Sequence, residues 1–366
     1  VALSDEHGLK GAFSVAQIRK IATQMDKTTD KEKVIDFINN ELLMVAETVD
    51  KWLLLKDHQT WGIPRVLKTS IAIYSPDVYC LLLYLAWLHP NLTVETYKRI
   101  TGIALFIHWF IDNKGKAVSS IYKKVYKSTD QNILTDLQES LKSDRDINEF
   151  LKRIQKPEFI KQIIDFSEEN LSNWEWNFCK KTFLELVKEE NTTEIEKNRI
   201  SLDYEKYIAP LLKSLKENRE LLLYAQRDYL SKRFPDYDPA RKDLWKDINR
   251  PWDFDHILPA VYVYNKKGSY SHINVCKQFY STIGNMRAWP FEDNRSDQAT
   301  KTSEKMIKSS YWTDSFIDDT ERDGYSDPSV IEDATKALRF ANSCKSRIIR
   351  IYKEWFYNFN INELLT

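Results

Sequence analysis

Glycine and proline are scarce in this chain of 366 residues, which contains only 8 Gly and 11 Pro. Five of the glycines precede residue 116, and none lies between Gly115 and Gly268. Because tight hairpins need turn residues of these types, their scarcity favours helices over hairpins. The chain nevertheless contains 11 Trp, 19 Tyr and 17 Phe, which argues against disorder and for a packed fold. We therefore expect a mainly α protein.

The chain also lacks a net charge, because Lys plus Arg and Asp plus Glu number 54 each. Overall charge therefore gives no indication of a nucleic-acid partner. Residues 250–310 are locally basic, with nine Lys/Arg against six Asp/Glu, while residues 311–333 are acidic. A positive face on a neutral protein is one interpretation of this distribution, and a well-mixed solvated surface is the other.

Three sequence features are missing that would indicate a structural zinc site, a membrane-spanning protein or a secreted protein. The four cysteines are scattered and form no Cys-x-x-Cys pair, which argues against a structural zinc site and for a reduced, cytoplasmic protein. The most apolar stretch, residues 78–88, is too short to span a bilayer, which needs roughly 20 residues. The first residues contain no basic segment or apolar run, so neither a signal peptide nor a membrane partner is expected.

The hydrophobic pattern divides the chain into three parts. Residues 1–200 show helical spacing throughout and predict a helical domain. Residues 201–310 begin with two helices, after which Pro, Gly and Asn become frequent and the pattern shortens. There we expect a strand over 252–258, a short helix over 271–280, a strand over 283–289 and a helix over 293–309. An acidic loop and a long amphipathic helix over 329–358, packed back on the scaffold, complete the chain.

Polar groups suited to phosphodiester hydrolysis gather in the second part. Asp255-His256 ends the first predicted strand, Asn285 begins the second, and Asn294 lies in the following helix. Such hydrolysis needs a base for the attacking water, and a neutral His is suited to that role. It also needs a cation to neutralise charge on the phosphate, and Asp and Asn supply the oxygen ligands that Mg²⁺ prefers. Each group also has an ordinary structural interpretation: an Asp-His pair commonly caps a turn, and Asn285 follows Gly284 as a turn residue would.

Together these residues resemble the HNH, or ββα-metal, nucleases. In that family an Asp-His pair ends the first strand, an Asn lies on the second strand or its turn, and a His or Asn opens the following helix. The run N-R-P-W-D-F-D-H-I-L-P, preceded by L-L-Y-A-Q-R-D-Y-L, is similar to the C-terminal nuclease domain of GmrSD-type and SspE-type modification-dependent restriction proteins of phage defence. The resemblance covers roughly residues 220–310 and implies a multi-helix scaffold with an embedded ββα-metal motif at 252–309.

The resemblance also implies roles for individual residues. His256 would be the general base and Asn285 would orient it. Asp255 and Asn294 would bind Mg²⁺ or Mn²⁺, and Asp253 is a possible extra ligand. Gln298 stands where many relatives have a second metal-binding His. The candidates for phosphate binding are Arg287, Arg295 and Lys301, although an ordinary solvated side chain is the favoured interpretation of each. Asn294 and Lys301, seven residues apart, would share one face of the expected helix.

The expected activity is metal-dependent cleavage or nicking of DNA, with RNA as an alternative substrate. The sequence contains no G-x-x-x-x-G-K-[ST] or G-x-G-x-x-G motif and thus no recognisable nucleotide-binding machinery. In the families that the chain resembles, a separate N-terminal domain hydrolyses nucleotide and senses the modification, so the resemblance implies such a domain as a partner. A homo-oligomer is also possible, since one site cuts one strand. Two rival hypotheses remain: a non-catalytic nucleic-acid-binding or regulatory module of HNH-like shape, and a helical interaction protein in which residues 250–300 merely connect other elements.

Overall fold

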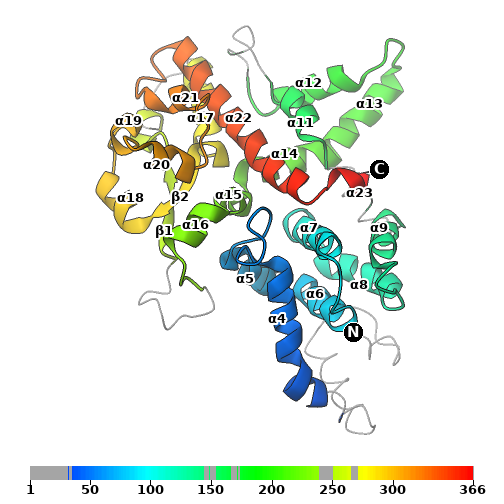
Figure 1. Cartoon of the computed structure of the whole chain (residues 1–366). Coiled ribbons are helices and arrows are strands. Elements are labelled where there is room, and N and C mark those ends of the chain that lie inside the picture. Colours follow the sequence, from blue (N-terminus) through cyan, green and yellow to red (C-terminus); the bar gives the residue numbers. More distant parts are fainter. Residues whose placement is uncertain are drawn as a thin grey trace. The chain divides into compact units, whose positions relative to one another are not determined.

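The computed structural model describes residues 35–143, 154–165, 174–238, 250–264 and 271–365, together with residues 32, 148 and 171. These residues are mainly helical, as the composition predicted, and contain one two-stranded sheet (Figure 1). The chain divides into two compact units, residues 1–151 with 359–366, and residues 152–358. The division therefore falls near residue 151 and not near residue 200, because the helices between these positions pack with the C-terminal part of the chain.

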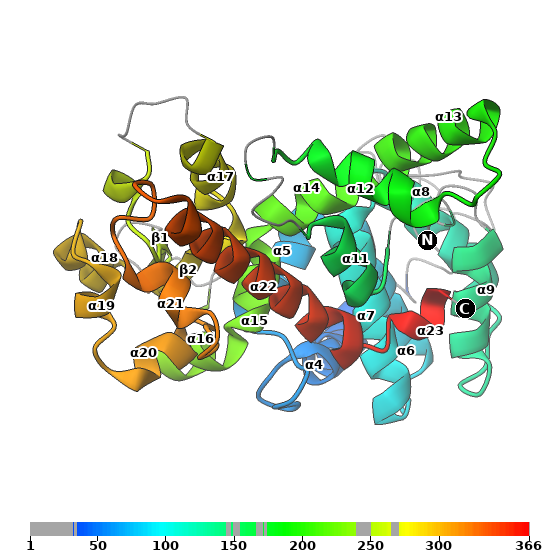
Figure 2. The same ribbon diagram turned by 90° about the horizontal axis from the view of Figure 1, so that it is seen from above.

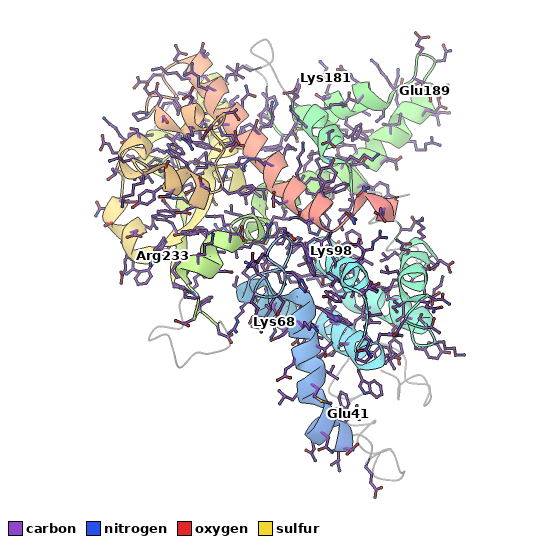
Figure 3. The ribbon with its side chains drawn as sticks, viewed as in Figure 1. Glu41, Lys68, Lys98, Lys181, Glu189 and Arg233 are labelled. Atoms are coloured by element: carbon purple, nitrogen blue, oxygen red, sulfur yellow. The ribbon has the colours of Figure 1, made fainter. Side chains whose placement is uncertain are left out.

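The first unit is built from helices alone within its described residues. They are η1 (Phe37–Glu41), α4 (Leu42–Leu53), α5 (Arg65–Tyr74), α6 (Pro76–Leu88), α7 (Val94–Phe110), α8 (Lys114–Val125), α9 (Ile133–Ser143) and α23 (Asn362–Leu365). Helix α7 forms the centre of this unit, since every residue from Ile100 to His108 is buried. Its N-terminus is capped by the Thr93 hydroxyl, which accepts from the Thr96 amide. At the edge of the unit, Lys68 on α5, labelled in Figure 3, forms an ion pair with Asp50 on α4.

The second unit contains the motif region. Its helices before the sheet are α11 (Pro157–Ile163), α12 (Phe178–Val187), α13 (Glu194–Asp203), η3 (Tyr204–Ile208), α14 (Ala209–Glu217), α15 (Arg219–Ala225) and α16 (Arg227–Arg233). The remaining elements are β1 (Trp252–His256), η5 (Ala260–Tyr262), α17 (Ser271–Tyr280), η6 (Ile283–Asn285), β2 (Met286–Pro290), α18 (Phe291–Asp297), α19 (Thr302–Lys305), α20 (Ser309–Asp314), α21 (Arg322–Ser326) and α22 (Ala334–Asn358). The expected helix over 271–280 is confirmed at those limits.

Helix α22 is the core element of the second unit. It packs against α11, α15, α17, α21 and η6, and it crosses this unit in both Figure 1 and Figure 2. The sequence predicted a helix from residue 329, but α22 begins at Ala334, because the Asp333 carboxylate accepts the amides of Thr335 and Lys336 and so caps the first turn. The acidic segment before it is not simply a loop, since it contains α20 and α21 and its acids accept local hydrogen bonds.

Arg347 on α22 fixes the turn that precedes β2. Its side chain is fully buried, and its guanidinium donates to four main-chain carbonyls, those of Ile283, Gly284, Ser315 and Phe316. The Tyr325 hydroxyl donates to the Gly284 carbonyl as well. A Cβ at Gly284 would lie 2.6 Å from the Cys344 carbonyl oxygen, so glycine is required where this turn meets α22. The position of η6 is therefore set by α22.

The sheet is a single antiparallel pair with Trp252 opposite Pro290 and His256 opposite Met286. Two strands are marginally stable alone, so the pair depends on what covers it. Helix α18 packs on both strands and α15 packs on β2. Gln226, which is buried, covers the outer edge of β2: its amide nitrogen donates to the Ala288 carbonyl at 3.3 Å, and its amide oxygen accepts the Ala288 N–H at 2.7 Å. One side chain thus occupies the place of a third strand.

No single helix in the described part of the chain is long and apolar enough to cross a membrane. Helices α5 and α6 meet that criterion of length and composition only as a pair, with a bend of 110° between them.

We predict that Arg347→Lys lowers the free energy of unfolding of the protein by about 3 kcal/mol. An ammonium group cannot reach four carbonyls, and each buried acceptor left without a donor costs about 1–3 kcal/mol. Urea unfolding measures the effect. Arg339→Lys, at an exposed position of the same helix, is the matched control and should change stability by about 0.5 kcal/mol or less. Equal effects of the two substitutions would contradict the role assigned to Arg347.

Candidate functional site

The strand β1 presents different chemistry on its two faces. Because side chains alternate along a strand, Asp253 and Asp255 lie on one face, and Phe254 and His256 lie on the other. Helix α18 packs over the strands and brings Asn294 to Asp253, with the Asn294 amide nitrogen 3.4 Å from the Asp253 carboxylate. Asn294 is thus joined to Asp253 near the start of β1, whereas Asp255 and His256 lie at its end, on opposite faces of the strand.

Asp255 is buried and paired with two cations. Its Oδ2 accepts from Arg287 Nε at 2.9 Å and lies 2.8 Å from Arg287 Nη2 and 3.4 Å from Lys305 Nζ. Asp297 on α18 lies 3.7 Å from the same guanidinium. Burial lowers the pKa of Lys305, and the charge of Asp255 opposes that shift. The result is a buried network in which each charge has an opposite partner.

Arg287 was a sequence-based candidate for phosphate binding, and the structure corrects this interpretation. The side chain is 0% exposed, and its ion pair with Asp255 lies directly across the sheet. Its guanidinium carbon also lies 3.8 Å from the ring centroid of Trp289, on the same face two residues along β2. Covered in this way, Arg287 has no path to a phosphate in solvent. The sequence did not indicate that Arg287 is buried, because the side chain of an Arg in a strand usually points to solvent.

Lys305 reaches Asp255 because the helix expected over 293–309 is broken. Helix α18 ends at Asp297, and Gln298 has φ 44°. The chain restarts at α19, where the buried Thr302 hydroxyl donates to the Ile257 carbonyl at 2.6 Å and Lys305 Nζ donates to the His256 carbonyl at 3.2 Å. These contacts draw the segment onto the end of β1. The expectation that Asn294 and Lys301 share one helix face was therefore wrong.

Arg295 and Lys301 are both exposed. The Arg295 guanidinium lies over the Phe291 ring at 5.0 Å, and Lys301 Nζ lies 3.7 Å from Glu304. Neither is joined to the Asp255 network by a hydrogen bond or ion pair within the described residues. Both positions are compatible with phosphate contact and equally with an ordinary solvated side chain.

Asn285 joins the start of β2 to the segment that follows His256. Its side chain is 0% exposed, its Oδ1 accepts the Leu258 amide at 2.9 Å, and its Nδ2 donates to the carbonyls of Leu258 and Tyr280. Its main-chain carbonyl accepts the Ile257 amide at 2.8 Å. Residues 257–258 are thus held to the turn that Arg347 fixes. Asn285 supports the position of His256 without contacting its ring.

His256 is partly buried and stacks on Tyr280 of α17, with ring centroids 4.4 Å apart and planes within 4°. Burial lowers the pKa of His256, the charge of Asp255 raises it, and the positive charges of Lys305 and Arg219 lower it further. The Nε2 atom is buried and has no hydrogen-bond partner among the described residues. The arrangement favours a neutral imidazole with an unused nitrogen.

Lys305, Asp297, Tyr280 and Arg219 were not singled out from the sequence. Asp297 lies three residues after Asn294, within one helical turn, and that spacing could have pointed to it. The other three come to β1 from elements distant in sequence, which no local pattern shows. No group of three or more His, Cys, Asp and Glu side chains able to hold a metal ion occurs among the residues that the structure describes.

No protein-family model matches this chain, and neither a curated protein nor a solved structure is significantly similar to it. The interpretation of the site therefore rests on its geometry and on the sequence pattern.

We predict that protonation of His256 destabilises the native protein. The native pKa lies below the ordinary value of 6.5, so the unfolded chain takes up this proton first as the pH falls. Stability associated with this group is therefore complete above about pH 7 and declines below about pH 6.5. Urea unfolding at about pH 7.5 and about pH 5 should show a larger loss for the wild type than for His256→Gln. The same loss in both proteins would contradict the lowered pKa.

Proposed function

We propose that this chain is a metal-dependent DNA endonuclease of the HNH type, and that it acts as the nuclease module of a modification-dependent phage-defence protein. The order of β1, α17, β2 and α18 supports this proposal, since the Asp-His pair, Asn285 and Asn294 follow one another along β1, the turn before β2 and α18, which is compatible with the order that the resemblance implies. The observation that carries it is His256: a lowered pKa and a buried nitrogen without a described partner suit a general base.

His256 would accept a proton from the attacking water. A base that works near neutral pH has to be unprotonated there, and burial together with two nearby cations favours that form. Tyr280 holds the plane of the ring by stacking, and Asn285 holds the main chain that follows it. A rigid support of this kind keeps the base in one orientation, which general-base catalysis requires.

The donor set fits a hard divalent cation. All hydrogen bonds and ion pairs of Asp255 with described residues use Oδ2, so Oδ1 is available to a ligand. Oδ1 of Asp255 and the amide oxygen of Asn294 would hold Mg²⁺ or Mn²⁺, with Asp253 as an additional oxygen ligand. When bound, the cation would neutralise charge that develops on the phosphate. Arg287 and Lys305 partly neutralise Asp255, so we expect weak metal binding in the absence of substrate.

A non-catalytic nucleic-acid-binding module is the second candidate. The observation in its favour is the ion pairing of Asp255 with two cations, which leaves little net negative charge at the proposed metal site. This alternative predicts that the wild type binds DNA or RNA but cleaves neither in Mg²⁺ or Mn²⁺.

We predict that the wild type nicks supercoiled plasmid in Mg²⁺ and that His256→Ala lowers the rate at least about 100-fold, the usual contribution of a general base. Gel separation of supercoiled, nicked and linear forms measures the rate, and EDTA should abolish it. Lys181→Gln, an exposed substitution on α12, serves as the control for purification and folding. Full activity of His256→Ala with an unchanged unfolding transition would refute the assignment.

We further predict that Lys305→Met strengthens Mn²⁺ binding roughly tenfold, which corresponds to about 1.4 kcal/mol. The substitution removes a buried positive charge 3.4 Å from Asp255 Oδ2. Electron paramagnetic resonance of free Mn²⁺ measures the affinity. Lys301→Met removes an exposed charge that is paired with Glu304 and should leave the affinity unchanged. Asp255→Asn in the Lys305→Met protein should abolish the gain, and a gain that survives would locate the ion elsewhere.

A further inference from the structure

Two arginines flank Phe254, on the same face of β1 as His256. The guanidinium carbon of Arg219, the first residue of α15, lies 4.8 Å from the Phe254 ring centroid, and that of Arg250 lies 4.7 Å from it. Both therefore make cation–π contacts with one ring. Two like charges are held within about 10 Å of each other, which is about one Debye length at 0.1 M salt.

Both arginines are exposed, and neither pairs with a carboxylate among the residues that the structure describes. No Asp or Glu within the described residues lies at salt-bridge distance from Arg219 or Arg250. Arg250 is oriented by Nε, which donates to the Trp252 carbonyl at 3.0 Å, and its terminal nitrogens make no hydrogen bond to the described residues. Contact with Phe254 holds each guanidinium while no described carboxylate pairs with its charge, which is the arrangement of an anion-binding surface.

On the opposite face of β1 the cations are buried and paired with acidic groups. The cations there are Arg287 and Lys305, Asp297 lies 3.7 Å from the Arg287 guanidinium, and Asp253 lies on the same face of the strand. An anionic ligand is therefore attracted to the Phe254 face and not to the Asp253 face. Arg219 contacts Phe254, and His256 lies on the same face of the strand two residues further on.

We propose that Arg219 and Arg250 bind phosphates of the nucleic-acid backbone on the Phe254 face of β1, beside His256. This inference rests on the proposed function, and it assigns phosphate contact to residues other than Arg287, Arg295 and Lys301. The Phe254 ring is occupied by the two guanidiniums and is not a stacking platform for bases. Binding at this surface is therefore directed to phosphate and independent of base sequence.

The test is DNA binding by the Arg219→Gln/Arg250→Gln protein, measured by fluorescence anisotropy with a labelled duplex in EDTA over a series of salt concentrations. Loss of two phosphate contacts lowers the slope of log Kobs against log salt by about 1.8. Lys181→Gln/Arg199→Gln removes two exposed charges from α12 and α13 and should leave the slope unchanged; Lys181 is labelled in Figure 3. Arg219→Lys/Arg250→Lys keeps both charges and should restore most of the slope. Duplexes of different sequence should give the same result.

A slope unchanged by Arg219→Gln/Arg250→Gln, or the absence of DNA binding by the wild type, overturns this inference. Because EDTA prevents cleavage, the outcome does not depend on catalysis. Plasmid nicking in Mg²⁺ that proceeds normally in the double variant would leave the proposed function in place and refute the phosphate contacts. A lowered slope in a protein that never nicks plasmid would refute the nuclease and retain the binding surface.

Discussion

The buried guanidinium of Arg347 is the interaction on which the candidate site depends. A charged side chain without solvent is tolerated where hydrogen bonds replace its hydration, and here each of the three guanidinium nitrogens donates to carbonyls of two separate segments. One of these segments is η6, which ends at Asn285. Asn285 in turn holds residues 257–258, which follow His256. The orientation of the imidazole is therefore connected to the long helix α22 through a chain of hydrogen bonds.

The Asp255 network has the corresponding role on the other face of β1. A two-stranded sheet has little stability of its own, and here side chains replace the missing strands. Arg287 joins β2 to β1 through Asp255, and it joins both to α18 through Asp297. Lys305 on α19 forms an ion pair with the same carboxylate. The network thus links β1, β2, α18 and α19, and loss of Asp255 would leave Lys305 without its carboxylate and Arg287 with only the more distant Asp297, which is costly to the fold.

The sequence predicted those strands and helices of the site that depend on neighbouring residues in the chain. Both strands and the helix between them were placed within a few residues, because alternation, Pro259 and Gly284 are local signals. The helix over 293–309 was wrong because Thr302 and Lys305 bind the end of β1, and that attraction comes from residues about 45 positions earlier. Arg287 was misinterpreted for the same reason, since its partner lies 32 positions away in sequence. Long-range pairing, unlike periodicity, leaves no mark in a single sequence.

The two faces of β1 are chemically distinct, and this separation constrains any mechanism. The carboxylates and Asn294 lie on the face that α18 covers, whereas His256, Phe254 and the two exposed arginines lie on the other. Lys305 lies at the end of the strand, because its ammonium group contacts the Asp255 carboxylate and also donates to the main-chain carbonyl of His256. In the proposed nuclease, a substrate phosphate attracted to Arg219 and Arg250 would approach the imidazole first. It could approach the carboxylates only by passing around the end of the strand. The end of β1, and not either face alone, is therefore where a scissile phosphate would have to lie.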